Sequence, residues 1–227
     1  TGLALLALSA LLTVQSTGTP VLLTSEPLAL WLTLPVLVVY PMLFAWLSHR
    51  TAIRLAEHKR RLELMSTRDG MTGVFNRRHW ETLLRNEFEA CRRSHRQATI
   101  LLIDIDHFKT INDTWGHDVG DEAIVAITRQ LQLTLRAGDY IGRFGGDEFA
   151  VIMSGTPADN AIAAMARVHE RLVNMPLHGA PMARLCISVG VAPWGAQFTH
   201  YREWLKAADV ALYKAKNAGR GRTEVAA

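Results

Sequence analysis

The order of apolar and polar positions divides the chain into two parts of different character. Residues 27–47 contain no charged side chain over 21 positions, and residues 3–14 are apolar as well. From residue 66 onward, apolar positions instead recur with the periods of helices and strands, separated by glycine, proline and charged turns. The pattern predicts an apolar region over residues 1–48 and a mixed helix-and-strand domain over residues 66–227.

In the second part, amphipathic helices alternate with short apolar strands. Asn76 is placed to cap a helix, and the apolar positions that follow it share one helical face. That face carries Trp80, Leu83, Leu84, Phe88 and Cys91. Further helices are predicted at about 119–136, after Pro157, and at 201–218, with strands at about 98–104 and 184–191 and a hairpin between them. This order predicts an α/β (α+β) fold: a central, mostly antiparallel sheet flanked by helices.

The apolar N-terminal region has the length of a membrane span. As a helix, residues 27–47 are long enough to cross a hydrocarbon core, whereas residues 3–14 are too short alone and are interpreted as the remainder of a truncated span. Residues 50–65 then carry five Lys or Arg and only two Glu. This bias predicts a multi-pass protein of the cell inner membrane, in contact with its lipid, with the C-terminal domain in the cytoplasm. A helix at residues 49–65 is expected to connect the two parts, and we interpret the chain as the C-terminal part of a longer protein.

The charge distribution and the cysteine spacing limit which partners and which metal or redox sites the chain can have. The net charge is +4 and the pI about 9.3. The excess lies beside the apolar region rather than on a face of the domain, so we expect no nucleic-acid partner. The two cysteines, Cys91 and Cys186, lack the spacing of a metal or redox motif and are interpreted as buried thiols.

Two glycines followed by two acids stand between apolar segments in the middle of the domain. This order predicts a β-hairpin with a tight turn, because Gly145 and Gly146 can adopt backbone angles closed to other residues and leave no Cβ beside a ligand. Asp147 and Glu148 at such a turn are costly unless they face a cation. Alone, the segment is typical of a solvated hairpin tip, but a second acidic segment changes the interpretation.

That second segment is apolar from residue 99 to residue 103 and acidic at Asp104 and Asp106. Carboxylates at the end of a buried strand are typical of metal ligands and catalytic groups. If the two strands are neighbours, Asp104 and Asp147 converge. Paired carboxylates without His or Cys suit Mg²⁺, which completes its shell with substrate phosphates. The residues alone therefore favour phosphoryl or nucleotidyl transfer.

Residues 143–149 read Arg-Phe-Gly-Gly-Asp-Glu-Phe, and this segment resembles the signature of the GGDEF family of diguanylate cyclases. Within that family the chain is most similar to the membrane-anchored AdrA-type enzymes. The resemblance extends over residues 66–227 through further motifs, at residues 69–78, 104–109, 112–121, 187–191, 208–209 and 213–220.

The resemblance implies a fold akin to nucleotidyl-cyclase and polymerase palm domains. It also implies an activity: a homodimer that condenses two GTP into cyclic di-GMP and two pyrophosphates, with Mg²⁺ or Mn²⁺ as cofactor. Asp104, Asp147 and the carbonyl of Ile105 match the metal-binding positions. Glu148 would act beside the attacking 3′-hydroxyl, as a metal ligand or as a proton acceptor. Asp106 is better interpreted as a strand-end cap or ion-pair partner.

The resemblance further implies a substrate site. Asp121 matches the acceptor for the N1–H and N2–H₂ donors of guanine, and Asn112 matches a second contact to the base. Positive charge and bare backbone are required around the triphosphate. The positions expected near the phosphates or beside the nucleotide are Lys216, Arg220, Lys109, Phe108, Gly145 and Gly146.

A product site is expected from a third motif. Arg136 and Asp139 form an Arg-x-x-Asp motif at the family's spacing before the signature, which implies an inhibitory site for cyclic di-GMP, with Arg167 as a further contact. Two alternatives stay open from the sequence. One is a catalytically silent GGDEF domain that serves as a nucleotide receptor or scaffold, and the other is a cyclase that makes a mononucleotide.

Overall fold

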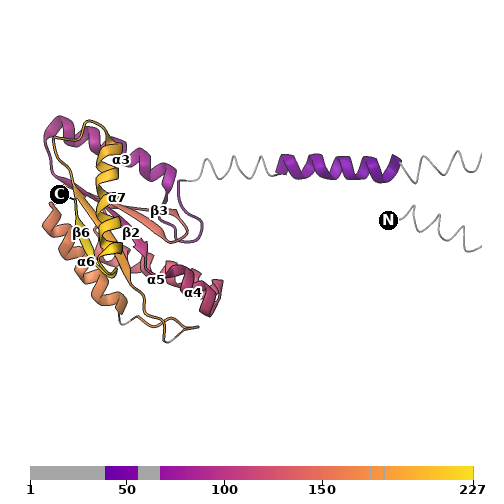
Figure 1. Cartoon of the computed structure of the whole chain (residues 1–227). Helices are drawn as coiled ribbons and strands as arrows, with labels where there is room; N and C mark the ends of the chain where they lie inside the picture. The colour runs from indigo at the N-terminus through magenta and orange to yellow at the C-terminus, as the bar shows by residue number, and fades with distance from the viewer. Residues whose placement is uncertain (1–38, 56–66, 174, 181, 227) are drawn as a thin grey trace, which may run out of the picture. The chain divides into compact units, whose positions relative to one another are not determined.

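The computed structural model describes residues 39–55, 67–173, 175–180 and 182–226 (Figure 1). By its internal contacts the chain divides into two units, Thr1–Glu63 and Leu64–Ala227. The second unit contains all the labelled helices and strands.

In the first unit the described residues 39–55 form a helix. The predicted segment at residues 3–14 lies outside the described residues, as do residues 27–38 of the predicted span. Within the part of the chain that the structure describes, no helix combines the length and the apolar character that crossing a membrane requires. Of the described helix, only residues 39–47 belong to the predicted apolar run, and the charged Arg50 and Arg54 follow them, whereas a span needs about 20 mainly apolar residues. The prediction of a multi-pass inner-membrane location is corrected accordingly, and the predicted lipid partner stays a prediction.

The second unit is built around one six-stranded sheet with the order β1-β3-β4-β2-β5-β6. The inner pairs β3–β4, β4–β2 and β2–β5 are antiparallel, whereas the edge pairs β1–β3 and β5–β6 are parallel. The predicted mostly antiparallel sheet is therefore a mixed sheet. Its strands are β1 (Phe75–Asn76), β2 (Ala98–Ile105), β3 (Tyr140–Gly145), β4 (Glu148–Ser154), β5 (Ile187–Pro193) and β6 (Thr223–Val225).

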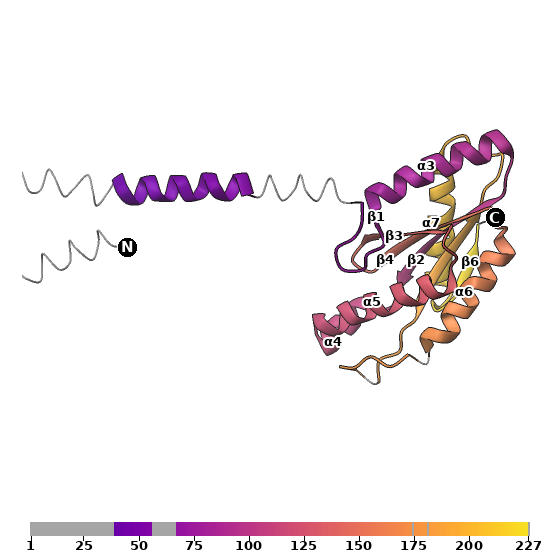
Figure 2. The same cartoon turned by 180° about the vertical axis from the view of Figure 1, so that it is seen from behind.

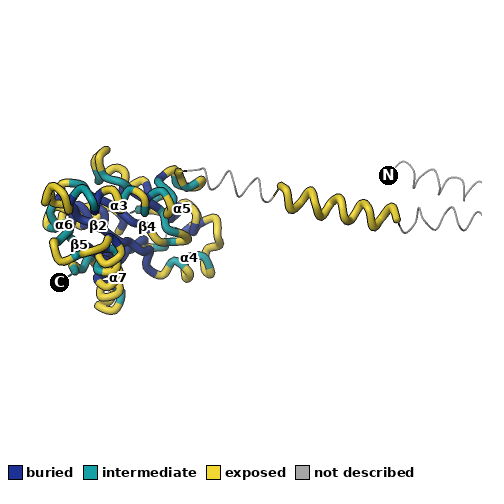
Figure 3. The backbone as a smooth tube through the Cα atoms, turned by 90° about the horizontal axis from the view of Figure 1, so that it is seen from above, coloured by how far each residue is buried: buried dark blue, intermediate teal, exposed yellow. Residues whose placement is uncertain are grey.

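Helices cover both faces of the sheet, so the unit has three layers (Figures 1 and 2). One face packs against α5 (His117–Thr134) and α6 (Ala158–Val173), and the other against α3 (Arg77–Ser94) and α7 (Tyr201–Asn217). The helix α4 (Phe108–Trp115) lies directly before α5. Figure 3 shows the buried strands at the centre of this unit with exposed residues around them.

Close packing places α7 over β5. A Cβ at Gly190 would stand 2.1 Å from the Ala208 carbonyl oxygen and 2.2 Å from the Leu212 nitrogen. Only a glycine permits that approach, which brings the middle of α7 directly against the sheet. Two of the predicted phosphate contacts lie further along the chain, Lys216 in the last turn of α7 and Arg220 in the loop that follows.

Several predicted elements are confirmed. The Asn76 side chain accepts a hydrogen bond from the His79 amide at 3.0 Å and caps α3. The strands at 98–105 and 187–193 and the helices α5, α6 and α7 lie close to their predicted positions. The short α4 and the edge strands β1 and β6 were not predicted, since β1 and β6 have only two and three residues and no period to detect.

Candidate active site

The predicted acidic strand ends are neighbours in the structure. Asp104, the last residue but one of β2, pairs in register with Glu148, the first residue of β4. The amide of Ile105 donates a hydrogen bond to the carbonyl of Asp147 at 3.2 Å. The condition that the sequence analysis set for this convergence, that the two strands are neighbours, is therefore met.

The turn between β3 and β4 is bare backbone. Gly145 and Gly146 both have positive φ, +150° and +47°, and the register between the strands shifts at this point. A Cβ built on either glycine meets nothing within 4 Å, so space is open beside the turn. The residues thus form the tight, accessible turn that the two glycines predicted.

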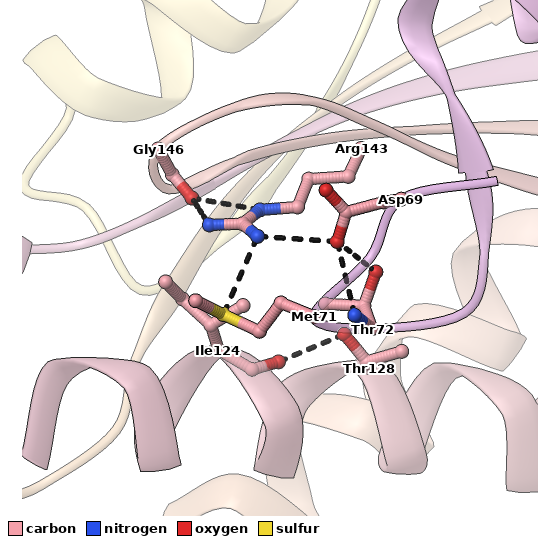
Figure 4. A network of polar contacts seen from close by, with 7 residues as sticks. All are labelled: Asp69, Met71, Thr72, Ile124, Thr128, Arg143 and Gly146. Carbon is pink, nitrogen blue, oxygen red and sulfur yellow. Dashed lines mark hydrogen bonds and ion pairs between the residues drawn. The ribbon is translucent and has the colours of Figure 1, made fainter. Parts of the chain in front are cut away.

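The side chain of Arg143 supports this turn (Figure 4). In the sequence analysis Arg143 was named only as part of the signature. Its guanidinium donates two hydrogen bonds to the Gly146 carbonyl, at 3.1 and 2.8 Å, and pairs with the Asp69 carboxylate at 3.2 Å. The Asp69 carboxylate in turn accepts from the amide and hydroxyl of Thr72, at 3.0 and 2.6 Å. Because Asp69 is 74 residues away along the chain, no local pattern points to this network.

The network also sets the ionisation of Asp69. Burial, the largest single influence, raises the pKa of this carboxyl, but the hydrogen bonds from Thr72 and Arg143 together lower the pKa below its ordinary value of 3.8. Asp69 therefore stays ionised and keeps Arg143 directed at the turn.

The pKa of Asp104 is shifted in the opposite direction. Burial raises the pKa of its carboxyl above the ordinary 3.8, and the negative charges of Asp147 and Glu148 raise it further. The ammonium of Lys216 opposes this rise from 2.7 Å. Three acids within electrostatic reach of one another are a typical environment for a cation-binding site.

Two predicted phosphate contacts come from the end of α7. Lys216 lies in its last turn and contacts Asp104, and Arg220 lies exposed in the loop that follows. Asp106, at the end of β2, accepts hydrogen bonds on both carboxylate oxygens, from the Ser188 hydroxyl and the Gly221 amide. It thus caps the strand end, as the sequence interpretation favoured.

The predicted base contacts lie on α4 and α5. Gly120 lets the two helices approach, since a Cβ there would stand 1.9 Å from Asn112 Oδ1 and 3.3 Å from the ring of Phe108. Among the described residues, Asn112 Oδ1 is buried without a hydrogen-bond partner. Asp121 lies exposed on α5, and Lys109 exposed on α4. A buried acceptor without a donor is costly, so its presence favours a ligand that supplies one.

A groove of about 310 Å³ lies on the α3 and α7 side of the hairpin. Its lining includes Glu148 and the signature residue Phe144, together with Arg77, Arg202 and Lys206. Neither α4 nor α5 contributes to this lining, so the groove adjoins the acidic turn but is separate from Asn112 and Asp121.

The predicted product motif is an ordered structure. Arg136 pairs with Asp139 at 3.3 Å and donates to the Ser154 carbonyl and, at 2.6 Å, to the Thr156 hydroxyl. Its side chain remains 59% exposed. Arg167 lies exposed on α6.

Arg171, another arginine of α6, contacts the chain just before the Arg-x-x-Asp motif. Arg171 donates to the Thr134 hydroxyl at 3.2 Å, at the end of α5 just before Arg136. The sequence analysis missed it, because nothing in the spacing of α6 distinguishes Arg171 from Arg167.

The donor atoms at the hairpin fit a magnesium ion only in part. In the described residues, no group of three or more His, Cys, Asp or Glu side chains is placed to hold a metal by itself. The candidate ligand atoms are the carboxylate oxygens of Asp104 and Asp147 and the carbonyl oxygen of Ile105. Oxygen-only donors in small number suit Mg²⁺, which commonly takes its remaining ligands from water and substrate phosphates.

Comparison with known proteins agrees with this geometry. Residues 66–222 match the family model described as the GGDEF domain of diguanylate cyclases. The chain belongs to the GGDEF family of diguanylate cyclases.

Individual relatives place the chain within that family. Over 226 residues it is 69% identical to a protein of Escherichia coli K12 named "Probable diguanylate cyclase DgcC"; the match covers 100% of this chain and 61% of the relative. The chain thus spans about three fifths of that relative's length.

Solved structures of the family share the fold. The GGDEF domain of DgcB from Caulobacter crescentus, in complex with c-di-GMP, matches with a TM-score of 0.68 and 27% identity, over 71% of this chain and 96% of that one. The active GGEEF domain of a diguanylate cyclase from Vibrio cholerae matches with a TM-score of 0.64 and 29% identity, over 67% of this chain and 97% of that one. Both solved structures are domains of the kind that the second unit of this chain forms.

Proposed function

We propose that the chain is a diguanylate cyclase that condenses two GTP molecules into cyclic di-GMP and two pyrophosphates. In each half-reaction, a 3′-oxygen loses its proton and attacks the α-phosphorus of the other GTP, and the bond to the β-phosphate oxygen breaks. The observation that carries the proposal is the register pairing of Asp104 with Glu148 beside the bare Gly145–Gly146 turn, in a domain of this family.

The metal-binding role falls to the oxygens at the end of β2 and at the turn. Asp104, Asp147 and the Ile105 carbonyl would hold Mg²⁺, or Mn²⁺ in its place, and Glu148 would face the attacking hydroxyl. When bound, such an ion supplies positive charge that stabilises the phosphates and lowers the pKa of the attacking hydroxyl. Lys216 and Arg220 would neutralise the triphosphate from the end of α7.

The base would be held between α4 and α5. Asn112 Oδ1, the buried acceptor without a partner among the described residues, suits an N–H donor of guanine. Asp121 would accept from guanine's N1–H and N2–H₂ groups. Adenine lacks these donors on that edge, so the two residues would select GTP over ATP.

Because one domain would bind one GTP, the active species would be a homodimer with two domains face to face. Cyclic di-GMP would inhibit through Arg136 and Asp139, whose arginine fork is held in place and largely exposed. The bonds to Asp139, Ser154 and Thr156 use Nε and Nη2 of Arg136, so its Nη1 would be the donor to a guanine edge or a phosphate.

Incubation of the chain with GTP and Mg²⁺, with the product identified by mass, tests the activity. Asp147→Asn should reduce product formation by at least ~100-fold, the scale of losing one strong electrostatic contact. Asp159→Asn, at an exposed acid in the first turn of α6, is the matched control and should retain activity. GTP binding without cyclic di-GMP in the parent chain would favour the silent receptor, and normal synthesis by Asp147→Asn would refute the metal site.

A further inference from the structure

The loop after α7 has an unusual backbone. Gly219, Arg220 and Gly221 all have positive φ, at +109°, +62° and +57°. Two of the three are glycines, for which this region is open, but Arg220 carries a side chain that disfavours it. Three such residues in a row need support from outside the loop if Arg220 is to keep one direction.

Asp106 supplies a contact of that kind. The amide of Gly221 donates to Asp106 Oδ2 at 2.8 Å, although the two residues are 115 positions apart. The other oxygen, Oδ1, accepts from the Ser188 hydroxyl at 2.6 Å, and the Asp106 amide donates to the Cys186 carbonyl at 2.9 Å. The residue is 4% exposed, so these bonds join the loop to the end of the central strand with little competition from water.

We propose that Asp106 is a positioning residue: it holds the Gly219–Gly221 loop so that Arg220 faces the phosphates of the bound nucleotide. The inference rests on the proposed function, which places Arg220 at the triphosphate. It assigns complementary tasks to two carboxylates of one strand end. Asp104 contacts Lys216 directly, and Asp106 acts on Arg220 through the backbone of its neighbour.

A purely structural role for Asp106 predicts a different kinetic change. Loss of folding stability alone would lower the amount of active protein and leave the KM for GTP unchanged. Loss of position at Arg220 would weaken phosphate binding and raise the KM. The split between KM and kcat therefore separates the two roles.

The test compares Asp106→Asn with Ser188→Ala in the full chain. The asparagine keeps the size of the side chain but is neutral and has one acceptor oxygen where the aspartate has two, so the bond to the Gly221 amide is either lost or loses its charge assistance. We expect its KM for GTP to rise about tenfold, the equivalent of 1.4 kcal/mol. Ser188→Ala removes the other bond to the same carboxylate without touching the loop, so its KM should stay within about twofold of the parent's, the scale of a small local adjustment. Equal KM values for Asp106→Asn and the parent would overturn the inference.

A second pair of variants tests whether Asp106 acts through Arg220. Arg220→Ala should raise the KM by itself, and adding Asp106→Asn to it should raise the KM no further. An unchanged KM in Arg220→Ala would refute the phosphate contact in the proposed function. A raised KM there, with Asp106→Asn either silent alone or fully additive, would refute only the positioning role.

One measurement needs no substitution and applies even if Asp106→Asn does not fold. In the parent chain the Gly221 amide should exchange its hydrogen slowly, because it is bonded to a buried carboxylate. The Gly219 amide in the same loop serves as the reference. If the Gly221 amide exchanges as fast as an unstructured peptide, the proposed support for the loop is wrong.

Discussion

Replacing Arg143 by methionine should separate the stability of the domain from the order of its catalytic turn. The side chain is only 11% exposed and contacts both the Gly146 carbonyl and the Asp69 carboxylate. Gly146 is exposed, so its carbonyl can bond to water after the change, and the loss of the two hydrogen bonds to this one acceptor should cost about 1 kcal/mol. The partly buried ion pair adds about 1 kcal/mol. For a domain of this size the total of about 2 kcal/mol lowers the Tm by about 4–8 °C.

Turnover should fall by more than the loss of folded protein alone would explain. Well below the Tm nearly all the protein is folded, so any loss of turnover there reflects the geometry of the turn that carries Asp147. A misplacement of about 1 Å at a reacting centre can cost ~100-fold in rate. Thermal unfolding and cyclic di-GMP synthesis at 25 °C, measured on the same preparations, give the two quantities.

Arg92→Met is the matched control for this experiment. Arg92 is 59% exposed and pairs with Glu89 one turn away on α3, so its loss should cost about 0.5 kcal/mol or less. If Arg143→Met and Arg92→Met lose the same stability and both keep full turnover, the proposed support of the turn by Arg143 is refuted.

The Asp69 pair adds a pH signature to the same experiment. The pKa of Asp69 in the folded chain lies below its ordinary value, so the ionised carboxylate contributes stability that is fully present above about pH 4. That contribution is lost as the pH falls through the lowered pKa. Removing Arg143 removes one cause of the lowering. The difference in Tm between the parent and Arg143→Met should therefore shrink below about pH 4, and a difference that is constant down to pH 2 would contradict the ion pair.

Three further outcomes are expected. Asp121→Ala should lower the use of GTP steeply and change any weak ATP reactivity much less; an unchanged preference would mean that guanine is recognised elsewhere. Specific activity should rise with enzyme concentration in the dilute range, because dimers would be the active species; constant specific activity where sizing detects only monomer would exclude this. Arg136→Ala should keep its initial velocity and lose inhibition by added cyclic di-GMP, and inhibition curves identical to the parent's would show that Arg136 only supports the end of β4.

Local patterns in the sequence were sufficient for the elements that depend on local chemistry. The cap at Asn76 and the apolar face of α3 follow from side-chain type and helical period, and both are present. The bare turn follows in the same way from Gly145 and Gly146, because glycine adopts positive φ more readily than other residues and carries no Cβ. Side chains whose partners lie within a few positions along the chain, or that belong to one continuous motif, can be recognised from the sequence alone.

The apolar run at residues 27–47 shows the limit of that approach. Its composition predicted a membrane span, but composition alone cannot decide how far a helix extends. In the described residues the helix reaches Arg50 and Arg54 and does not meet the requirements of a span.

Long-range partners were decided only by the tertiary structure. The sequence contains Asp69, Arg143, Asp106 and Gly221 as separate residues, and the contacts of Arg143 with Asp69 and of Asp106 with Gly221 arise because distant segments meet in the folded domain. Whether Asp104 meets Glu148 likewise depended on β2 lying beside β4, a pairing that crosses more than 40 positions of chain. The physical reason is that hydrogen bonds and ion pairs act over a few ångströms of space, whereas sequence patterns report only neighbours along the chain.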